Sequence, residues 1–204
     1  SGFSNPYGAA VSFDHKVLFV TSDSHTVLRV NVATKVVTTL AGSARGFSDG
    51  IGPAASFNDL AGIAVTSNGA AVFVGDYGNN RVRKIDVVTA AVTTLAGSSS
   101  GKLDGVGTGA KFAVPNGVSL HGDGATLFVA DQSNSLIRVV GTGLLSLPLP
   151  MGLGVTSTIA GSGTSSFADG TGSSASFCQS AHGAITNDGA LLYIGDTCNH
   201  RIRI

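Results

Sequence analysis

The chain has 204 residues, of which 12 are basic and 12 acidic, so its formal net charge is zero. This balance argues against a nucleic-acid binder, which needs an excess or a stripe of Lys and Arg, and no apolar run reaches the ~18 residues of a membrane span. Only 12% of the residues are charged and 29 are glycine, a composition that favours short strands joined by tight turns over long solvated helices.

One phrase recurs along the chain and predicts a series of related structural units. In this motif two apolar runs flank a polar turn. The clearest copy is Val72–Ile85, with the sequence Val-Phe-Val-Gly-Asp-Tyr-Gly-Asn-Asn-Arg-Val-Arg-Lys-Ile. The copies lie at Leu18–Val30, Val72–Ile85, Leu127–Val139 and Leu192–Ile204. Two further landmarks keep the same phasing, namely Asp-Gly pairs at Asp49, Asp104 and Asp169 and Ala-x-Phe triplets ending at Phe57, Phe112 and Phe177.

Two sets of residues align the copies. These are the opening glycines Gly8, Gly62, Gly117 and Gly183 and the closing arginines Arg29, Arg83, Arg138 and Arg203. The alignment predicts a single repeat region over residues 1–204, with whole units at about 7–42, 61–97 and 116–161 and a partial unit at 182–204.

Each unit reads as four short strands. In the second unit they are expected at Gly62–Thr66, Ala71–Gly75, Arg81–Asp86 and Ala91–Ala96, and Ser67-Asn68-Gly69 is a turn signal between the first two. The third strand is expected to point Arg81 and Arg83 outward and Val82 and Ile85 inward. No window has sustained helical periodicity, so the predicted fold class is all-β.

Repeated four-stranded units of this length are typical of propeller blades. The segments Gly75–Arg83 and Gly195–Arg203 resemble the signature of NHL repeats, and Thr39–Gly42 and Asp49–Phe57 resemble phrases of its longer variant. The resemblance implies an NHL-type β-propeller with antiparallel blades over nearly the whole chain. The first copy departs from it. Ser22 stands where the others have Asp, and His25 stands where the second copy has Asn79.

The number of blades is low for a closed ring. The chain holds about 3.7 blades, whereas propellers close with ~4–8. We therefore expect a fragment of a larger propeller whose open ends favour self-association.

The recurring polar residues of the turns are expected to be structural. The carboxylates of Asp76, Asp131 and Asp196 and the amides of Asn79, Asn134 and Asn199 suit turn positions. Each Asp-Gly-x-Gly loop offers one carboxylate, too few for the ~6–8 oxygen ligands of calcium. No catalytic motif, zinc spacing or cofactor motif is visible, so the sequence predicts no catalytic residue, no metal and no cofactor.

The resemblance places the first strand of each blade at a central channel. The residues before the opening glycines should then ring one mouth of that channel. Three of them, Tyr7, Asn116 and His182, are the candidate site for a small ligand or ion.

Two further groups are candidates for partner binding. Variable turn residues on the same face are Tyr77, Asn80, Arg81, His200 and Arg201. An insertion around Gly141–Leu153, on the opposite face, adds Leu144, Leu145 and Leu147. This apolar loop is expected either to pack back on its blade or to contact a partner or a second copy.

The two cysteines form a candidate pair. Cys178 precedes the first strand of the last blade and Cys198 lies in its second turn, at the same end of neighbouring strands. A disulfide is therefore feasible, and unpaired thiols are the alternative. A bridge would point to an oxidising compartment, which favours an extracellular or cell-surface location.

The sequence favours a non-enzymatic binding or scaffold module whose loop face contacts a protein, peptide or glycan. The alternative is a channel-centred enzyme similar to metal-dependent lyases and lactonases, or a small-ligand sensor, using Tyr7, Asn116 and His182.

Overall fold

The computed structural model describes residues 5–144, 152–186 and 188–204. Within these ranges the regular structure is β-strand and short 3-10 turns, arranged as four antiparallel sheets. The all-β prediction is confirmed.

The four sheets repeat one plan in which consecutive strands are neighbours. The first sheet contains β1 (Pro6–Val11), β2 (Val17–Ser22), β3 (Thr26–Asn31) and β4 (Val37–Ala41). The second contains β6 (Leu60–Val65), β7 (Ala71–Asp76), β8 (Arg81–Asp86) and β9 (Ala91–Gly97), with the short β5 (Gly50–Ile51) on its outer edge. The third contains β11 (Pro115–Leu120), β12 (Thr126–Asp131), β13 (Leu136–Gly141) and β14 (Val155–Ala160), with β10 (Gly105–Val106) outside. The fourth contains β15 (Ser180–Ile185), β16 (Leu192–Asp196) and β17 (Arg201–Arg203).

Short 3-10 turns punctuate the same places in successive units. Three follow the Asp-Gly pairs, and three lie between the second and third strands of the last three sheets. They are η1 (Gly52–Ala54), η2 (Tyr77–Asn79), η3 (Gly107–Gly109), η4 (Gln132–Asn134), η5 (Gly172–Ser174) and η6 (Thr197–Asn199).

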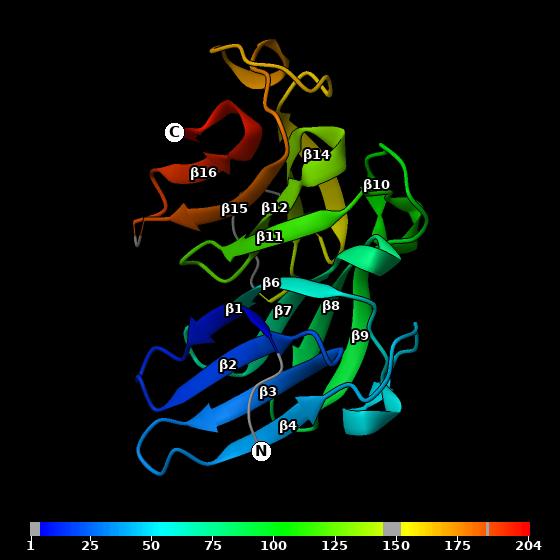
Figure 1. Ribbon diagram of the computed structural model, residues 1–204, viewed down its shortest axis with the longest axis vertical. Coiled ribbons are helices and arrows are strands. Elements are labelled where there is room, and N and C mark those ends of the chain that lie inside the picture. The colour runs from blue at the N-terminus through cyan, green and yellow to red at the C-terminus, as the bar shows by residue number, and fades with distance from the viewer. Residues whose placement is uncertain (1–4, 145–151, 187) are drawn as a thin grey trace.

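The sheets fan out from a shared centre as blades of a propeller (Figure 1). The first strands lie innermost, and they contact one another in chain order, β1 with β6, β6 with β11 and β11 with β15. The predicted β-propeller, with an inner first strand in each blade, is therefore confirmed.

Glycine allows this close approach of the inner strands. A Cβ atom added to Gly62 would lie 2.8 Å from the Asn116 carbonyl oxygen, and one added to Gly8 would lie 2.7 Å from the Ala61 carbonyl oxygen. Both contacts are with backbone, which cannot move aside as a side chain can. Inner-strand packing thus explains Gly8 and Gly62.

The hydrophobic core lies between successive sheets. Three clusters of buried side chains fill the spaces between the first and second, second and third, and third and fourth sheets. The phenylalanine of each Ala-x-Phe triplet is buried in one of them, as Phe57, Phe112 and Phe177. Each linker therefore contributes an aromatic side chain to the interface between the blade that it leaves and the blade that it enters.

Candidate functional site

The signature residues of the repeats form a buried network. In the second sheet, Arg83 donates to Asp76 at 2.7 Å and Asn79 donates to the same carboxylate at 2.9 Å. A third donor is the Asn58 N–H, 2.8 Å from Asp76. Asp131 with Asn134 and Arg138, and Asp196 with Asn199 and Arg203, repeat the pattern.

Each network also fastens the linker that precedes it. The second Nη atom of Arg83 donates to Asp49 at 2.6 Å, and Asp49 accepts the Thr94 N–H of β9 at 3.2 Å. Asp49 of the Asp-Gly pair thus joins the linker to two strands of its blade. Gly52, two residues after the pair, has a φ of 55°, in the left-handed region that favours glycine. The expected structural role of these residues agrees with this geometry.

Burial is the largest influence on the pKa of two of these carboxylates. Burial raises the pKa of Asp76 and of Asp131, while hydrogen bonds from Asn79 and Asn134, from backbone N–H groups and from the arginines oppose the rise. The outward orientation expected for Arg83 was wrong, because its guanidinium is fully buried as the counter-ion of Asp76. Alternation along a strand does not anticipate such a pair.

The first sheet lacks the network. The turn after Ser22 is one residue shorter, and the register pairs Leu28 with Val20 where the second sheet pairs Arg83 with Val74. Leu28, and not Arg29, therefore corresponds to Arg83. His25 corresponds to Asn80 and not to Asn79, since both have left-handed φ and both accept a backbone N–H of the next linker.

The predicted disulfide is present between Cys178 and Cys198, with Cα atoms 5.4 Å apart. The Cys178 N–H donates to Asp196 as the Asn58 and Ala113 N–H groups donate to their own aspartates. The Cys198 N–H also donates to the Cys178 carbonyl oxygen, as the Gly78 and Ser133 N–H groups donate to the carbonyl oxygens of Asn58 and Ala113. The bridge therefore reinforces a backbone contact that the second and third sheets make without a covalent bond.

A cavity of about 360 Å³ opens at the centre of the propeller, where the far ends of the four inner strands meet. We call it the central pocket. Its floor contains the last residue of each inner strand, and in all four strands this residue is a branched aliphatic one. For β1, β6, β11 and β15 these residues are Val11, Val65, Leu120 and Ile185, respectively. These residues occupy equivalent register positions, so the fold itself brings them together.

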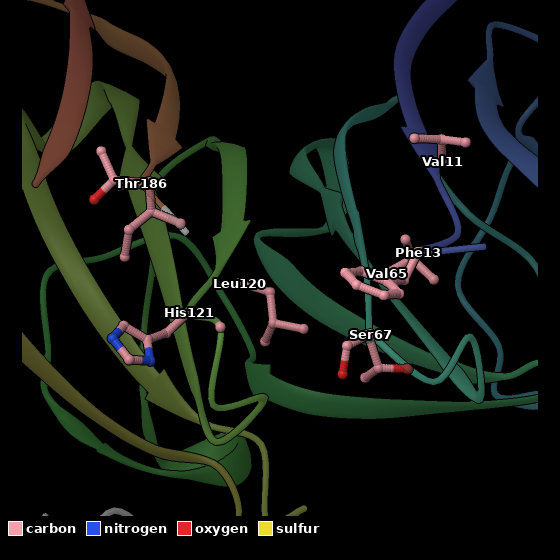
Figure 2. A pocket seen from close by; sticks show the side chains of 10 residues that line it. Val11, Phe13, Val65, Ser67, Leu120, His121 and Thr186 are labelled. Atoms are coloured by element: carbon pink, nitrogen blue, oxygen red, sulfur yellow. The ribbon is translucent and has the colours of Figure 1, made fainter. Parts of the chain in front are cut away.

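Turn residues form the rest of the wall. They are Phe13, Thr66, Ser67, His121, Gly122 and Thr186. In Figure 2 the Leu120 side chain points toward Val65 and Phe13, whereas the His121 ring points away from them. His121 Nδ1 lies 2.9 Å from an Asp123 oxygen, which orients the ring. Among the described residues, the lining contains no Asp, Glu, Lys or Arg side chain.

Phe13 is the exception among its equivalents. Ser67 and Gly122 occupy the corresponding turn positions of the second and third sheets, whereas Phe13 is an aromatic residue that is 78% exposed. The sequence analysis missed this pocket because its aliphatic residues look like ordinary core. The detectable signal was an aromatic residue in one of the equivalent turns.

The predicted ligand residues lie at the opposite ends of the inner strands. Pro6, Pro115 and Ser180 each pair with the last residue of the second strand of their sheet, namely Ser22, Asp131 and Asp196. These three residues are therefore equivalent. The residue that follows each of them is equivalent too, so the counterpart of Tyr7 and Asn116 is Ala181. His182 instead takes the position of Gly8, Gly62 and Gly117, which corrects the equivalence assumed from the sequence. Tyr7 is 59% exposed and Asn116 donates to Gln132 at 3.1 Å. None of the three lines the central pocket, and their joint binding stays a prediction.

The predicted partner residues have varied surroundings. Arg81 stacks 3.8 Å from the Phe47 ring and Arg201 stacks 3.9 Å from Phe167. Asn80 accepts the Val114 N–H, and His200 is exposed. Burial raises the pKa of Tyr77, and the nearby charge of Asp59 adds a smaller contribution.

The insertion is only partly described. Leu144 is 38% exposed at the end of the described segment, and Leu145 and Leu147 lie outside the described residues. Within the described ranges, no group of three His, Cys, Asp or Glu side chains could hold a metal ion, and no helix is long and apolar enough to cross a membrane.

Comparison with known proteins identifies relatives by sequence. The chain is 32% identical over 160 residues to NHL repeat-containing protein 2 of Bos taurus, and 31% identical over 160 residues to its Homo sapiens counterpart. Each alignment covers 74% of the chain and 21% of the relative. Protein SUPPRESSOR OF QUENCHING 1 of Arabidopsis thaliana is 31% identical over 151 residues, covering 69% of the chain and 14% of the relative. The alignments thus span between 14% and 21% of these relatives, and no protein-family model matches the chain.

Solved structures share the fold at low identity. An auxiliary nutrient binding protein of Bacteroides thetaiotaomicron has a TM-score of 0.71 at 15% identity, covering 99% of this chain and 59% of that one. A second, from Bacteroides ovatus, has a TM-score of 0.73 at 22% identity, covering 98% and 48%. At these identities the likeness carries the architecture alone.

Proposed function

The chain belongs to the NHL-repeat proteins, and on that basis we propose that it is a non-enzymatic binding module for a protein or peptide partner. The partner inserts an apolar side chain into the central pocket. Because the relatives are several times longer, the proposal concerns this chain and not their complete activities.

One observation carries the proposal, namely the convergence of four aliphatic strand ends and an exposed aromatic ring on one cavity. Phe13 is 78% exposed and Val11 45% exposed, so apolar surface faces water at the centre of the face. Contiguous exposed apolar surface of this kind marks interaction sites in soluble proteins. A concave, apolar place with a few polar groups is also where ligands bind.

The exposure of the lining favours a macromolecular occupant over a free small molecule. Small-molecule sites bury ~70–90% of their ligand, and a wall as exposed as Phe13 leaves much of an occupant uncovered. An anchor side chain avoids this difficulty, since the remainder of its own protein covers the outer side. Anchors of this type are the residues that dominate binding energy at protein interfaces.

The neutral lining is consistent with an apolar anchor. A phosphate, a carboxylate or a metal ion would enter a pocket without an opposite charge to stabilise it, and burial of an unpaired charge is costly. The two structural neighbours described as nutrient binding proteins are compatible with a binding use of the same architecture. The residues Tyr77, His200 and Arg201 on the opposite face remain candidates for a separate contact.

The test is a selection of random peptides displayed on phage against the immobilised chain. We expect enriched peptides to share an aromatic or aliphatic anchor and to lose binding to Phe13→Ser, which installs the residue found at the equivalent position of the second sheet. Val88→Ser is the matched control, because Val88 is 88% exposed in the β8–β9 hairpin and does not line the pocket. Peptides that bind wild type and Phe13→Ser equally would overturn the proposal.

A further inference from the structure

The turns that surround the central pocket carry a repeated acidic position. Four equivalent turn residues follow the strand ends of the pocket floor, in the order Asp14, Asn68, Asp123 and Asp188. In every case the side-chain oxygen accepts a backbone N–H two residues later, from Lys16, Ala70, Ala125 and Ala190. This hydrogen bond stabilises the turn.

Asn68 shows that the turn needs an oxygen acceptor and not a negative charge. Its Oδ1 accepts the Ala70 N–H at 3.0 Å and the Thr66 hydroxyl at 2.7 Å, which are the same two contacts that Asp14 makes with Lys16 and Ser12. The carboxylates at the other three positions therefore bring a charge that the local structure does not require.

Two of these carboxylates, Asp14 and Asp188, are held in the charged form by hydrogen bonds. Hydrogen bonds from Ser12 and from Thr186, respectively, lower the pKa of Asp14 and of Asp188, so both are ionised at neutral pH. In the described residues of the four turns, Lys16 is the one Lys or Arg side chain, and it forms an exposed ion pair with Asp14 at 3.6 Å. His121 is beside Asp123. The rim is net acidic.

We propose that the central pocket recognises an apolar anchor residue carried in a basic segment of a protein partner, with Lys or Arg side chains beside the anchor. This inference rests on the proposed function and specifies the chemistry of its partner. The four strand ends and Phe13 receive the anchor, and the carboxylates of Asp14, Asp123 and Asp188 attract the flanking cations. Complementary charge at a rim contributes to association rate and partner choice and weakens with salt.

The structure offers variants that remove the charge and retain the turn. Asp14→Asn, Asp123→Asn and Asp188→Asn reproduce the acceptor that Asn68 already provides. Asp86→Asn is the matched control, because Asp86 caps the β8–β9 hairpin through the Thr89 N–H as Asn31 caps the β3–β4 hairpin through the Thr34 N–H. Asp86 does not line the pocket.

The experiment measures the dissociation constants of the anchor peptides enriched in the phage selection, as synthetic peptides, for the full chain at low and high salt. We expect Lys or Arg beside the anchor, and a loss of affinity of at least about threefold in the triple Asn variant, as expected for a few exposed charge contacts. Asp86→Asn should lose less, and 0.5 M NaCl should remove the difference between wild type and the triple variant.

The outcomes separate this inference from the proposed function. Anchor peptides without basic neighbours, or with equal affinity for wild type and the triple variant, overturn the acidic-rim inference and leave the binding module in place. Peptides that also bind Phe13→Ser equally overturn both. Circular dichroism and thermal melts of each variant verify that the folded state is retained before the affinities are compared.

Discussion

Arg83 lies 2.7 Å from Asp76, and neither side chain has exposed surface. This pair is the centre of a network that holds a linker, a turn and two strands in one arrangement, and Arg138 and Asp131 repeat it in the next blade. The residues that make the repeat recognisable in the sequence are therefore those that secure each blade.

Removal of one partner of the buried pair should be costly. Arg83→Ala leaves Asp76 without its counter-ion in a buried place, and we expect a loss of roughly 3–5 kcal/mol in the free energy of unfolding. Arg45→Ala is the control, because Arg45 makes an exposed ion pair with Asp59 at 3.4 Å and should cost at most about 1 kcal/mol. Urea titration measures both. Similar losses for the two variants would contradict a special role of the buried pair.

The first blade should reject the signature carboxylate. Ser22 is buried and occupies the position of Asp76, but Leu28 occupies the position of Arg83. Ser22→Asp should therefore destabilise the protein by a few kcal/mol at pH 7. Burial raises the folded-state pKa of an unpaired carboxyl, so the deficit should be absent below the unfolded pKa of ~3.9 and should grow as the pH rises.

The measurement for this second prediction is the unfolding free energy of the variant and of wild type at several pH values. Addition of Leu28→Arg should recover part of the loss at pH 7, because it supplies the counter-ion. A deficit that does not change with pH would point to steric crowding.

The disulfide should stabilise the fourth blade measurably. The cysteines are separated by 20 positions, and closing a loop of this size is worth about 3 kcal/mol in the chain-entropy model. The double variant Cys178→Ala, Cys198→Ser reproduces the third-sheet pair Ala113 and Ser133, whose backbone hydrogen bond is the same. It should unfold at lower denaturant than wild type. A reducing agent should destabilise wild type and leave the variant unchanged; no effect on wild type would exclude the predicted contribution.

The inner strands should not tolerate a side chain at their glycines. Gly117→Ala would bring a Cβ within 2.8 Å of the His182 Cα on β15, so the two strands must separate. We expect a loss of roughly 1–3 kcal/mol, as for other overpacked positions. Gly109→Ala is the control, since a Cβ there has nothing within 4 Å. Thermal unfolding of the two variants compares them, and equal midpoints would contradict close packing at the centre.

Much of the architecture followed from the sequence. The repeated apolar runs predicted the blades, and the strands of the second unit were correct to within two residues at each end. Prediction of the pairing between Cys178 and Cys198 was possible because both residues lie at the same end of neighbouring strands. Each of these features follows from local sequence patterns, which can be recognised without knowledge of the tertiary structure.

The errors arose where a single residue changes the register. His182 was aligned with Tyr7 and Arg29 with Arg83, and strand pairing shifts both by one position. A one-residue shift moves a side chain to the other face of its sheet, and only the hydrogen-bonded partner strand specifies which face it takes. The burial of Arg83 was missed for a different reason, because alternation along a strand does not anticipate a buried ion pair.

The blades, their strands and the structural role of the signature residues thus came from local patterns along the chain. The central pocket came only from the packing of the sheets, because Val11, Val65, Leu120 and Ile185 are far apart in the chain and meet at one cavity when the blades converge. Each of them has the sequence character of a core residue. Whether such a residue is covered depends on the curvature of the whole assembly, which no segment contains by itself.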